Sequence, residues 1–282
     1  MSQFLKIVLK YFIFCVIIVV AAFLYIRNYN IDRSWKINKK GFHILFVGDS
    51  HIEQSIYDED RNGIKTFAQS GDNYLYTYSK LKKILADNSG IDTVLIGIDF
   101  HNIDLTASEW YSSQSYLDYK FPQCFPFMEL EDFKVLFKYN PIGFVKSLPN
   151  LFAFNDLQLK KDYINMYGSF QASDSIIIST QVHQSKYLNN ASKIQLKYLG
   201  KIIDLCIMKN IKPILITTPL HNCIERNSKL EHIILNFVDQ YRLSYFNNRN
   251  MDLPDSFYRN SSHLNTNGAK YYTNYLFNIL YK

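Results

Sequence analysis

The chain has 282 residues, of which 48% are hydrophobic and 20% are charged, and this composition excludes a disordered protein or a collagen-like repeat. The formal net charge is +6 at pH 7, but the basic residues are scattered along the chain, so we expect no nucleic-acid partner. The four cysteines lack the Cys and His spacings that bind zinc, and we expect neither a metal site nor a cofactor.

The cysteines also bear on disulfide formation. Cys15 lies in an apolar segment and Cys206 at an apolar helix position, where a free cysteine packs as a small hydrophobic side chain. Cys124 and Cys223 are therefore the two cysteines that suit a disulfide. The sequence alone does not show whether they pair.

The first predicted element is a long apolar helix at the N-terminus. Residues 4–26 are apolar apart from two lysines near the start, and at about 1.5 Å per residue this stretch crosses the roughly 30 Å hydrocarbon layer of a membrane. A cleaved signal peptide is the alternative, but apolar residues continue past Ala21 and Ala22 without a cleavage pattern. We therefore predict an uncleaved transmembrane anchor over 1–27 and a tether over 28–42.

The charges beside this helix leave its orientation open. Lys6 and Lys10 lie at one end, whereas five basic residues follow the other end: Arg27, Arg33, Lys36, Lys39 and Lys40. The positive-inside rule would keep the second group, and with it the rest of the chain, in the cytoplasm.

After the tether, short buried strands alternate with amphipathic helices. The strand patterns fall at 43–47, 93–98, 213–217 and, more weakly, 243–246. The helical patterns fall at 73–88, 199–206 and 266–280. Continuous apolar runs are typical of parallel strands that are covered on both faces. The alternation predicts an α/β domain over 43–282, a three-layer α/β/α sandwich around a parallel, flavodoxin-like sheet.

Residues 101–190 interrupt this alternation. They contain four prolines, mixed aromatic and polar runs, and short helical patterns such as the one over 130–139. We predict a mainly helical insertion here, whose aromatic residues pack internally or face the cleft or the membrane.

A serine and a histidine stand where such a domain binds its ligands. Ser50 follows the first strand in the sequence GDSH at 48–51, and His263 lies in a polar loop just before the last helix. A serine hydroxyl needs a base to become a nucleophile, and imidazole is suited to that task. The other interpretation makes Ser50 a helix cap and His263 a loop residue that only forms hydrogen bonds. An α/β-hydrolase is disfavoured, because the second glycine of its G-x-S-x-G elbow is missing.

These residues resemble the SGNH (GDSL-type) esterase and acyltransferase superfamily. The resemblance rests on the sequence GDS at 48–50, on Gly71 at the position that follows the second strand of the family, and on His263 in the closing loop, which together span most of the domain. It implies that Ser50 attacks an acyl carbonyl, that His263 is the general base, and that the backbone N–H groups of Ser50 and Gly71 bind the oxyanion.

Two positions depart from the family pattern. The block that carries the third oxyanion donor usually reads Gly-x-Asn-Asp, whereas this chain has GIDFHN at 97–102, so Asn102 or Asn73 would have to supply the amide. The triad aspartate is replaced by Asn260, whose carbonyl orients an imidazole without supplying a negative charge. Asp252 and Asp255, upstream in the same loop, are alternative orienters. His101 and His221 follow other strands and are candidate substrate-binding residues.

The sequence HLN at 263–265, followed by Gly268 and Ala269 and combined with an N-terminal anchor, looks like the membrane-tethered branch of the superfamily. That branch includes the D-alanyl lipoteichoic acid and alginate O-acetylation proteins. The resemblance implies an extracytoplasmic domain that works with a membrane-bound O-acyltransferase on a cell-envelope glycan or glycolipid of a bacterium. Two alternatives stay open: an anchored carbohydrate esterase, and a catalytically degenerate scaffold for the acyltransferase.

Overall fold

A five-stranded parallel sheet organises the computed structural model, which describes residues 3–32, 35–37, 41–59, 63–105, 112–151, 190–222 and 227–280. Its strands are β1 Ile44–Val47, β2 Ile64–Thr66, β3 Thr93–Gly97, β4 Lys212–Thr217 and β5 Ser244–Asn247. They pair in the order β2-β1-β3-β4-β5. This is the flavodoxin-like order, and it confirms the predicted fold. The sequence pattern does not locate β2, because an edge strand of three residues leaves little periodicity.

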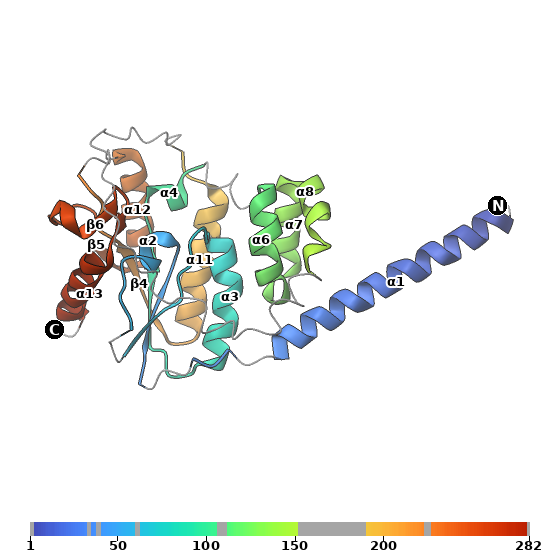
Figure 1. Ribbon diagram of the computed structural model, residues 1–282, viewed down its shortest axis with the longest axis horizontal. Coiled ribbons are helices and arrows are strands. Elements are labelled where there is room, and N and C mark those ends of the chain that lie inside the picture. Colours follow the sequence, from blue (N-terminus) through green and yellow to red (C-terminus); the bar gives the residue numbers. More distant parts are fainter. Residues whose placement is uncertain are drawn as a thin grey trace.

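Helices cover both faces of the sheet, as Figure 1 shows. Alternate side chains of β1 enter two separate apolar clusters, with Leu45 in one and Phe46 in the other. The first cluster includes residues of α3 Tyr74–Asp87, α11 Lys193–Met208 and α12 Ser228–Tyr241. The second includes residues of α2 Ser50–Glu53 and α13 Thr266–Leu280. Strands buried on both faces therefore explain the continuous apolar runs in the sequence.

The described part of the insertion after β3 is helical. It comprises α4 Phe100–Ile103, α6 Gln114–Cys124, the 3₁₀ turn η1 Phe125–Phe127, α7 Leu130–Tyr139 and α8 Pro141–Ser147. Phe121, Met128 and Leu136 are fully buried in the same cluster as α3 and α11, so the insertion shares the core of the α/β domain. Residues 152–189 of the expected insertion lie outside the described residues.

The sequence left open whether Cys124 and Cys223 pair. Cys124 is a free, buried thiol, and burial raises its pKa to about 12. Its proposed partner, Cys223, lies outside the described residues.

The N-terminal helix α1, Gln3–Asp32, projects from the side of the molecule that carries the insertion (Figure 1). Its apolar part is long enough to cross a membrane, and its side chains from Gln3 to Val20 are exposed. The helix continues into the segment expected as a tether. Further along that segment, the backbone N–H of Ile37 donates to Asn88 Oδ1 at 2.9 Å, just after α3.

A buried ion-pair cluster joins α3 to α6. The carboxylate of Asp72 accepts hydrogen bonds from Lys120 Nζ, at 2.9 Å, and from Lys80 Nζ. All three side chains are at most 2% exposed. Two buried ammonium groups therefore share one carboxylate.

Replacement of Asp72 by Asn should be severely destabilising. It removes the charge that compensates both lysines, and breaking a buried ion pair costs about 3–5 kcal/mol. Denaturant unfolding in detergent micelles measures the loss. Glu131→Gln is the control, because Glu131 is half exposed in its pairs with Lys197 and Lys201 and should contribute less than about 1 kcal/mol. Equal losses in the two variants would contradict the role of Asp72.

Candidate active site

β1 places Ser50 at the carboxyl edge of the sheet. Asp49 is the N-cap of α2, since its Oδ1 accepts the backbone N–H of His51 at 3.0 Å. Ser50 is therefore the first residue of the helix and not its cap. The alternative interpretation of Ser50 as a helix cap is wrong. The backbone N–H of Ser50, in the first turn of α2, has no acceptor in the described part of the chain.

A small hairpin brings His263 to Ser50. β6 Tyr258–Asn260 and β7 His263–Leu264 pair antiparallel just before α13. His263 Nε2 lies 2.9 Å from Ser50 Oγ, and His263 Nδ1 lies 3.0 Å from Asn260 Oδ1. An amide oxygen only accepts hydrogen bonds, so the proton of a neutral imidazole is on Nδ1, and Nε2 is free to accept the proton of Ser50.

Asn260 is itself held in place. Its Oδ1 also accepts the backbone N–H groups of Ser262 and His263, both at 3.0 Å. The two upstream aspartates are placed differently: Asp252 is exposed, and Asp255 Oδ1 lies 3.2 Å from His221 Nε2. The structure thus places Asn260, at the position of the family's acid, against His263.

Gly71 lies on a turn that faces this pair. Its φ is +75°, and the backbone N–H of Asp72 donates to the carbonyl of Gln69 at 2.9 Å, as in a type II turn that needs glycine at the third position. A Cβ atom at Gly71 would lie 2.9 Å from Tyr116 Oη. The N–H of Gly71 has no acceptor among the described residues.

The two candidate asparagines differ in what they already bind. Asn102 Nδ2 donates to Asp49 Oδ2 at 2.8 Å, and its Oδ1 accepts the N–H of Asp99 at 2.8 Å in a capping box. Asn73 caps α3 through Oδ1, which accepts the N–H of Tyr76 at 3.2 Å. Its Nδ2 is buried without a hydrogen-bond partner in the described chain, so of the two amides it is the one that is not already occupied.

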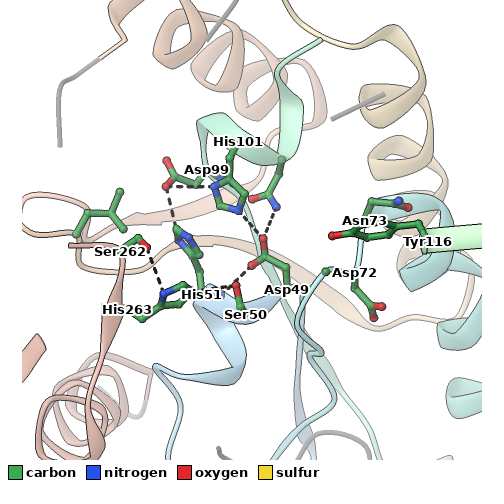
Figure 2. Close-up of a pocket in the computed structure, with 13 residues that line it drawn as sticks. Asp49, Ser50, His51, Asp72, Asn73, Asp99, His101, Tyr116, Ser262 and His263 are labelled. Carbon is green, nitrogen blue, oxygen red and sulfur yellow. Dashed lines mark hydrogen bonds and ion pairs between the residues drawn. The ribbon is translucent and has the colours of Figure 1, made fainter. Parts of the chain in front are cut away.

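A cavity of about 340 Å³ lies beside Ser50 and His263. Its lining includes Ser50, His263, Gly71, Asn73 and Tyr116, and Figure 2 shows how the labelled side chains lie around it. Of the two candidate substrate-binding histidines, His101 lines the cavity, whereas His221 does not line it and lies against the ring of Tyr258 instead.

A network of charges lies beside Ser50 that sequence reasoning missed. His101 Nε2 donates to Asp49 Oδ2, and its Nδ1 lies 3.7 Å from Asp99 Oδ2 (Figure 2). Arg249 donates to the other oxygen of Asp99 from 150 residues along the chain. Asp49 and Asp99 look like ordinary turn residues in the sequence, and nothing there links them to Arg249.

His51, Asp99 and His101 also offer three donor atoms within 4.8 Å of one another, a spacing that a metal ion tolerates. However, each carboxylate is already paired with a cation, Asp49 with His101 and Asp99 with Arg249. The charges of the cluster are thus balanced without a metal, and we interpret it as an ion-pair network.

These charges set the protonation states of the site. Burial would raise the pKa of the Asp49 carboxyl, but the neighbouring His101 and His51 hold that pKa well below its usual range. Burial would also lower the pKa of His101, but Asp49 and Asp99 raise it to about 10. At neutral pH the pair is therefore an aspartate and an imidazolium.

His263 is in the opposite state. Burial and the positive charges of His101 and Arg259 lower its pKa to about 4, although Asp49 acts in the other direction. Burial and His101 likewise lower the pKa of His51 to about 3. His263 is consequently neutral over the physiological range, as a general base must be.

Comparison with known proteins gives remote likenesses only. No family model matches the chain, and no curated protein sequence matches it. A solved structure of a candidate acylhydrolase from Bacteroides fragilis is 10% identical with a TM-score of 0.44, covering 86% of this chain and 88% of its own. A GDSL-like lipase from Bacteroides thetaiotaomicron is 10% identical with a TM-score of 0.42, covering 92% and 96%.

The protonation states are directly testable. A histidine with the ordinary pKa of about 6.5 is roughly nine-tenths protonated at pH 5.5, whereas His263 should still be neutral there and His101 should stay charged up to at least pH 8.5. Nitrogen-15 NMR of the labelled imidazoles follows both, with His101→Gln and His263→Gln to assign the signals. Titration of His263 near pH 6.5 would contradict the charge network.

Proposed function

We propose that this chain is a membrane-anchored serine enzyme that transfers an acyl group to a cell-envelope glycan or glycolipid. The observation that carries the proposal is the 2.9 Å contact between His263 Nε2 and Ser50 Oγ inside a cavity. Asn260 fixes the histidine tautomer that this chemistry needs. The motif resemblance to SGNH enzymes supports the same assignment.

In the first half-reaction, Ser50 Oγ attacks the carbonyl carbon of an acyl ester while its proton passes to His263 Nε2. The N–H groups of Ser50 and Gly71 and Nδ2 of Asn73 stabilise the oxyanion of the tetrahedral intermediate. The protonated His263 then gives its proton to the leaving oxygen as the ester bond breaks. The product is an acyl group on Ser50.

In the second half-reaction, a sugar hydroxyl gives its proton to His263 and attacks the acyl-serine. The proton returns to Ser50 Oγ when the acyl group leaves. Asn260 orients the imidazole but supplies no negative charge. The imidazolium that forms in each step is destabilised by the nearby cations, and Asp49 is the one group named here that stabilises it. We therefore expect a slow enzyme.

The remaining parts of the proposal concern place and partner. The exposed apolar helix α1 supports membrane anchoring, and the resemblance to the tethered branch supports an extracytoplasmic domain that receives its acyl group from a membrane-bound O-acyltransferase.

An anchored carbohydrate esterase would use the same residues and differ only in taking water as the acceptor. Incubation with an acyl ester and an oligosaccharide distinguishes them, since only transfer yields an acylated sugar. The Ser50–His263 contact favours either enzyme over a degenerate scaffold.

The nucleophile assignment predicts covalent labelling of Ser50. A fluorophosphonate probe should modify the wild-type protein, and Ser50→Ala and His263→Ala should each abolish labelling and turnover of a simple ester. Because the two residues act as a unit, the double variant should be about as inactive as either single one. Tyr116→Phe is the control, since Tyr116 also lines the cavity but has no role in the proposed steps. Undiminished labelling of Ser50→Ala would eliminate the mechanism.

Asn260→Asp should make the enzyme faster. In serine proteases the reverse change of the triad lowers kcat by about 10⁴, and a carboxylate beside Nδ1 would also raise the pKa of His263. We expect at least roughly a tenfold gain in kcat and an acid limb of the pH–rate profile that moves to higher pH. Asn260→Ala should lower kcat, since it leaves the imidazole without its orienter. A gain from Asn260→Ala would show that another group orients His263.

A further inference from the structure

One exposed face of the insertion combines apolar and basic side chains. We define the α7–α8 face by four apolar residues and two lysines: Leu130, Phe137, Ile142, Val145, Lys134 and Lys138. The apolar residues are 50–70% exposed. Residues 130, 134, 137 and 138 recur at the spacing of one helix side, while Asp132 and Leu136 on the other side of α7 are buried. The Phe137 ring meets the Phe144 ring of α8, with centroids 6.0 Å apart, so the two helices pack together, and the insertion leaves a largely exposed amphipathic surface.

This face lies close to the point where α1 meets the domain. The Phe23 ring of α1 lies 5.7 Å from the Phe125 ring of η1, and Arg27 Nη2 donates to the Met128 carbonyl at 3.3 Å. Leu130, the first residue of α7, follows directly. Figure 1 shows α6, α7 and α8 on the side of the molecule from which α1 projects. If α1 crosses a membrane, the bilayer surface is next to the Leu130 end of this face.

The composition of the face favours lipid over a protein partner. Lysine is depleted from the centres of protein–protein interfaces, whereas helices that lie on a membrane combine lysine with large apolar residues. Leu130 lies between two glutamates that are both paired, Glu129 with Lys82 and Glu131 with Lys197 and Lys201, so their charges do not oppose an anionic surface. Lys134 and Lys138 are exposed.

We propose that the α7–α8 face rests on the membrane surface, with its apolar side chains at the boundary between headgroups and acyl chains and its lysines near anionic headgroups. The proposal rests on the anchoring part of the proposed function and not on its chemistry. The protein then touches the bilayer at two places, through α1 and through α7–α8. Such contact holds the domain in one orientation above the lipid.

The test measures how close the face comes to lipid in the full-length chain. The protein is placed in nanodiscs containing anionic phosphatidylglycerol and a lipid with a nitroxide on its headgroup or upper acyl chain. Cys15 and Cys223 are replaced by Ser, because Cys15 is exposed; Cys124 and Cys206 are buried thiols. A fluorophore is attached at Phe137→Cys or Ile142→Cys. Tyr271→Cys on α13 is the matched control, since Tyr271 and Phe137 are both 50% exposed.

The nitroxide lipid should quench the probes at Phe137→Cys and Ile142→Cys at least several-fold more than the probe at Tyr271→Cys. Adding Lys134→Glu and Lys138→Glu should reduce this quenching when anionic lipid is present. Equal quenching at all three positions would overturn the proposal and direct attention to a protein partner for the face.

Two readouts on the same samples separate this inference from the proposed function. Resistance of the protein to alkaline extraction reports whether α1 is anchored, and loss of the protein to the soluble fraction would overturn both the anchoring and the docking. Labelling by the fluorophosphonate probe reports whether the site is intact in each variant. A protein that is anchored and labelled but shows no preferential quenching would overturn the docking alone.

Discussion

The hydrogen bond between His263 and Ser50 joins residues 213 positions apart, and much of the fold acts to keep its two ends in place. β1 and the Asp49 cap fix Ser50. On the other side, Asn265 ties the hairpin to α13, because its Nδ2 donates to the Ser256 carbonyl at 2.7 Å and its Oδ1 accepts the N–H of Gly268 at 3.0 Å. A Cβ atom at Gly268 would lie 2.2 Å from the Phe257 carbonyl oxygen, so this close approach requires glycine.

The electrostatics of the site follow from where its charges are buried. In a Ser-His-Asp triad, a carboxylate lies next to the histidine. Here the nearby carboxylate is that of Asp49, beside Ser50, and the imidazolium of His101 largely offsets its charge. His263 is left as a neutral, weakly basic imidazole. His263 is therefore neutral and oriented over a wide pH range. It is also a weak base, because a group of low pKa takes a proton less readily in the transition state.

Sequence reasoning reached the parts of this architecture that depend on local patterns. The buried strands predict a parallel α/β sheet, and strand ends converge at one edge, which is why Ser50 and Gly71 are brought together. His263 reaches them from the β6–β7 hairpin. Local patterns do not predict contacts between residues that are far apart in the sequence, such as the ion pair of Asp99 with Arg249, which are 150 residues apart. They also fail to separate residues of one type, since Asn102 is occupied by its cap and by Asp49 while Asn73 keeps a free amide.

The junction between α1 and the domain has a mechanical consequence. Ile26 of α1 is buried in the main apolar cluster, and the Trp35 ring packs against Phe127 with centroids 4.7 Å apart. A helix joined to its domain by such contacts moves together with the domain and not independently of it. If α1 spans a membrane, its tilting as the bilayer thins or thickens would turn the domain and change the height of Ser50, the proposed nucleophile, above the lipid. Acceptor groups would then be reached within a narrow layer instead of along the full length of a polymer.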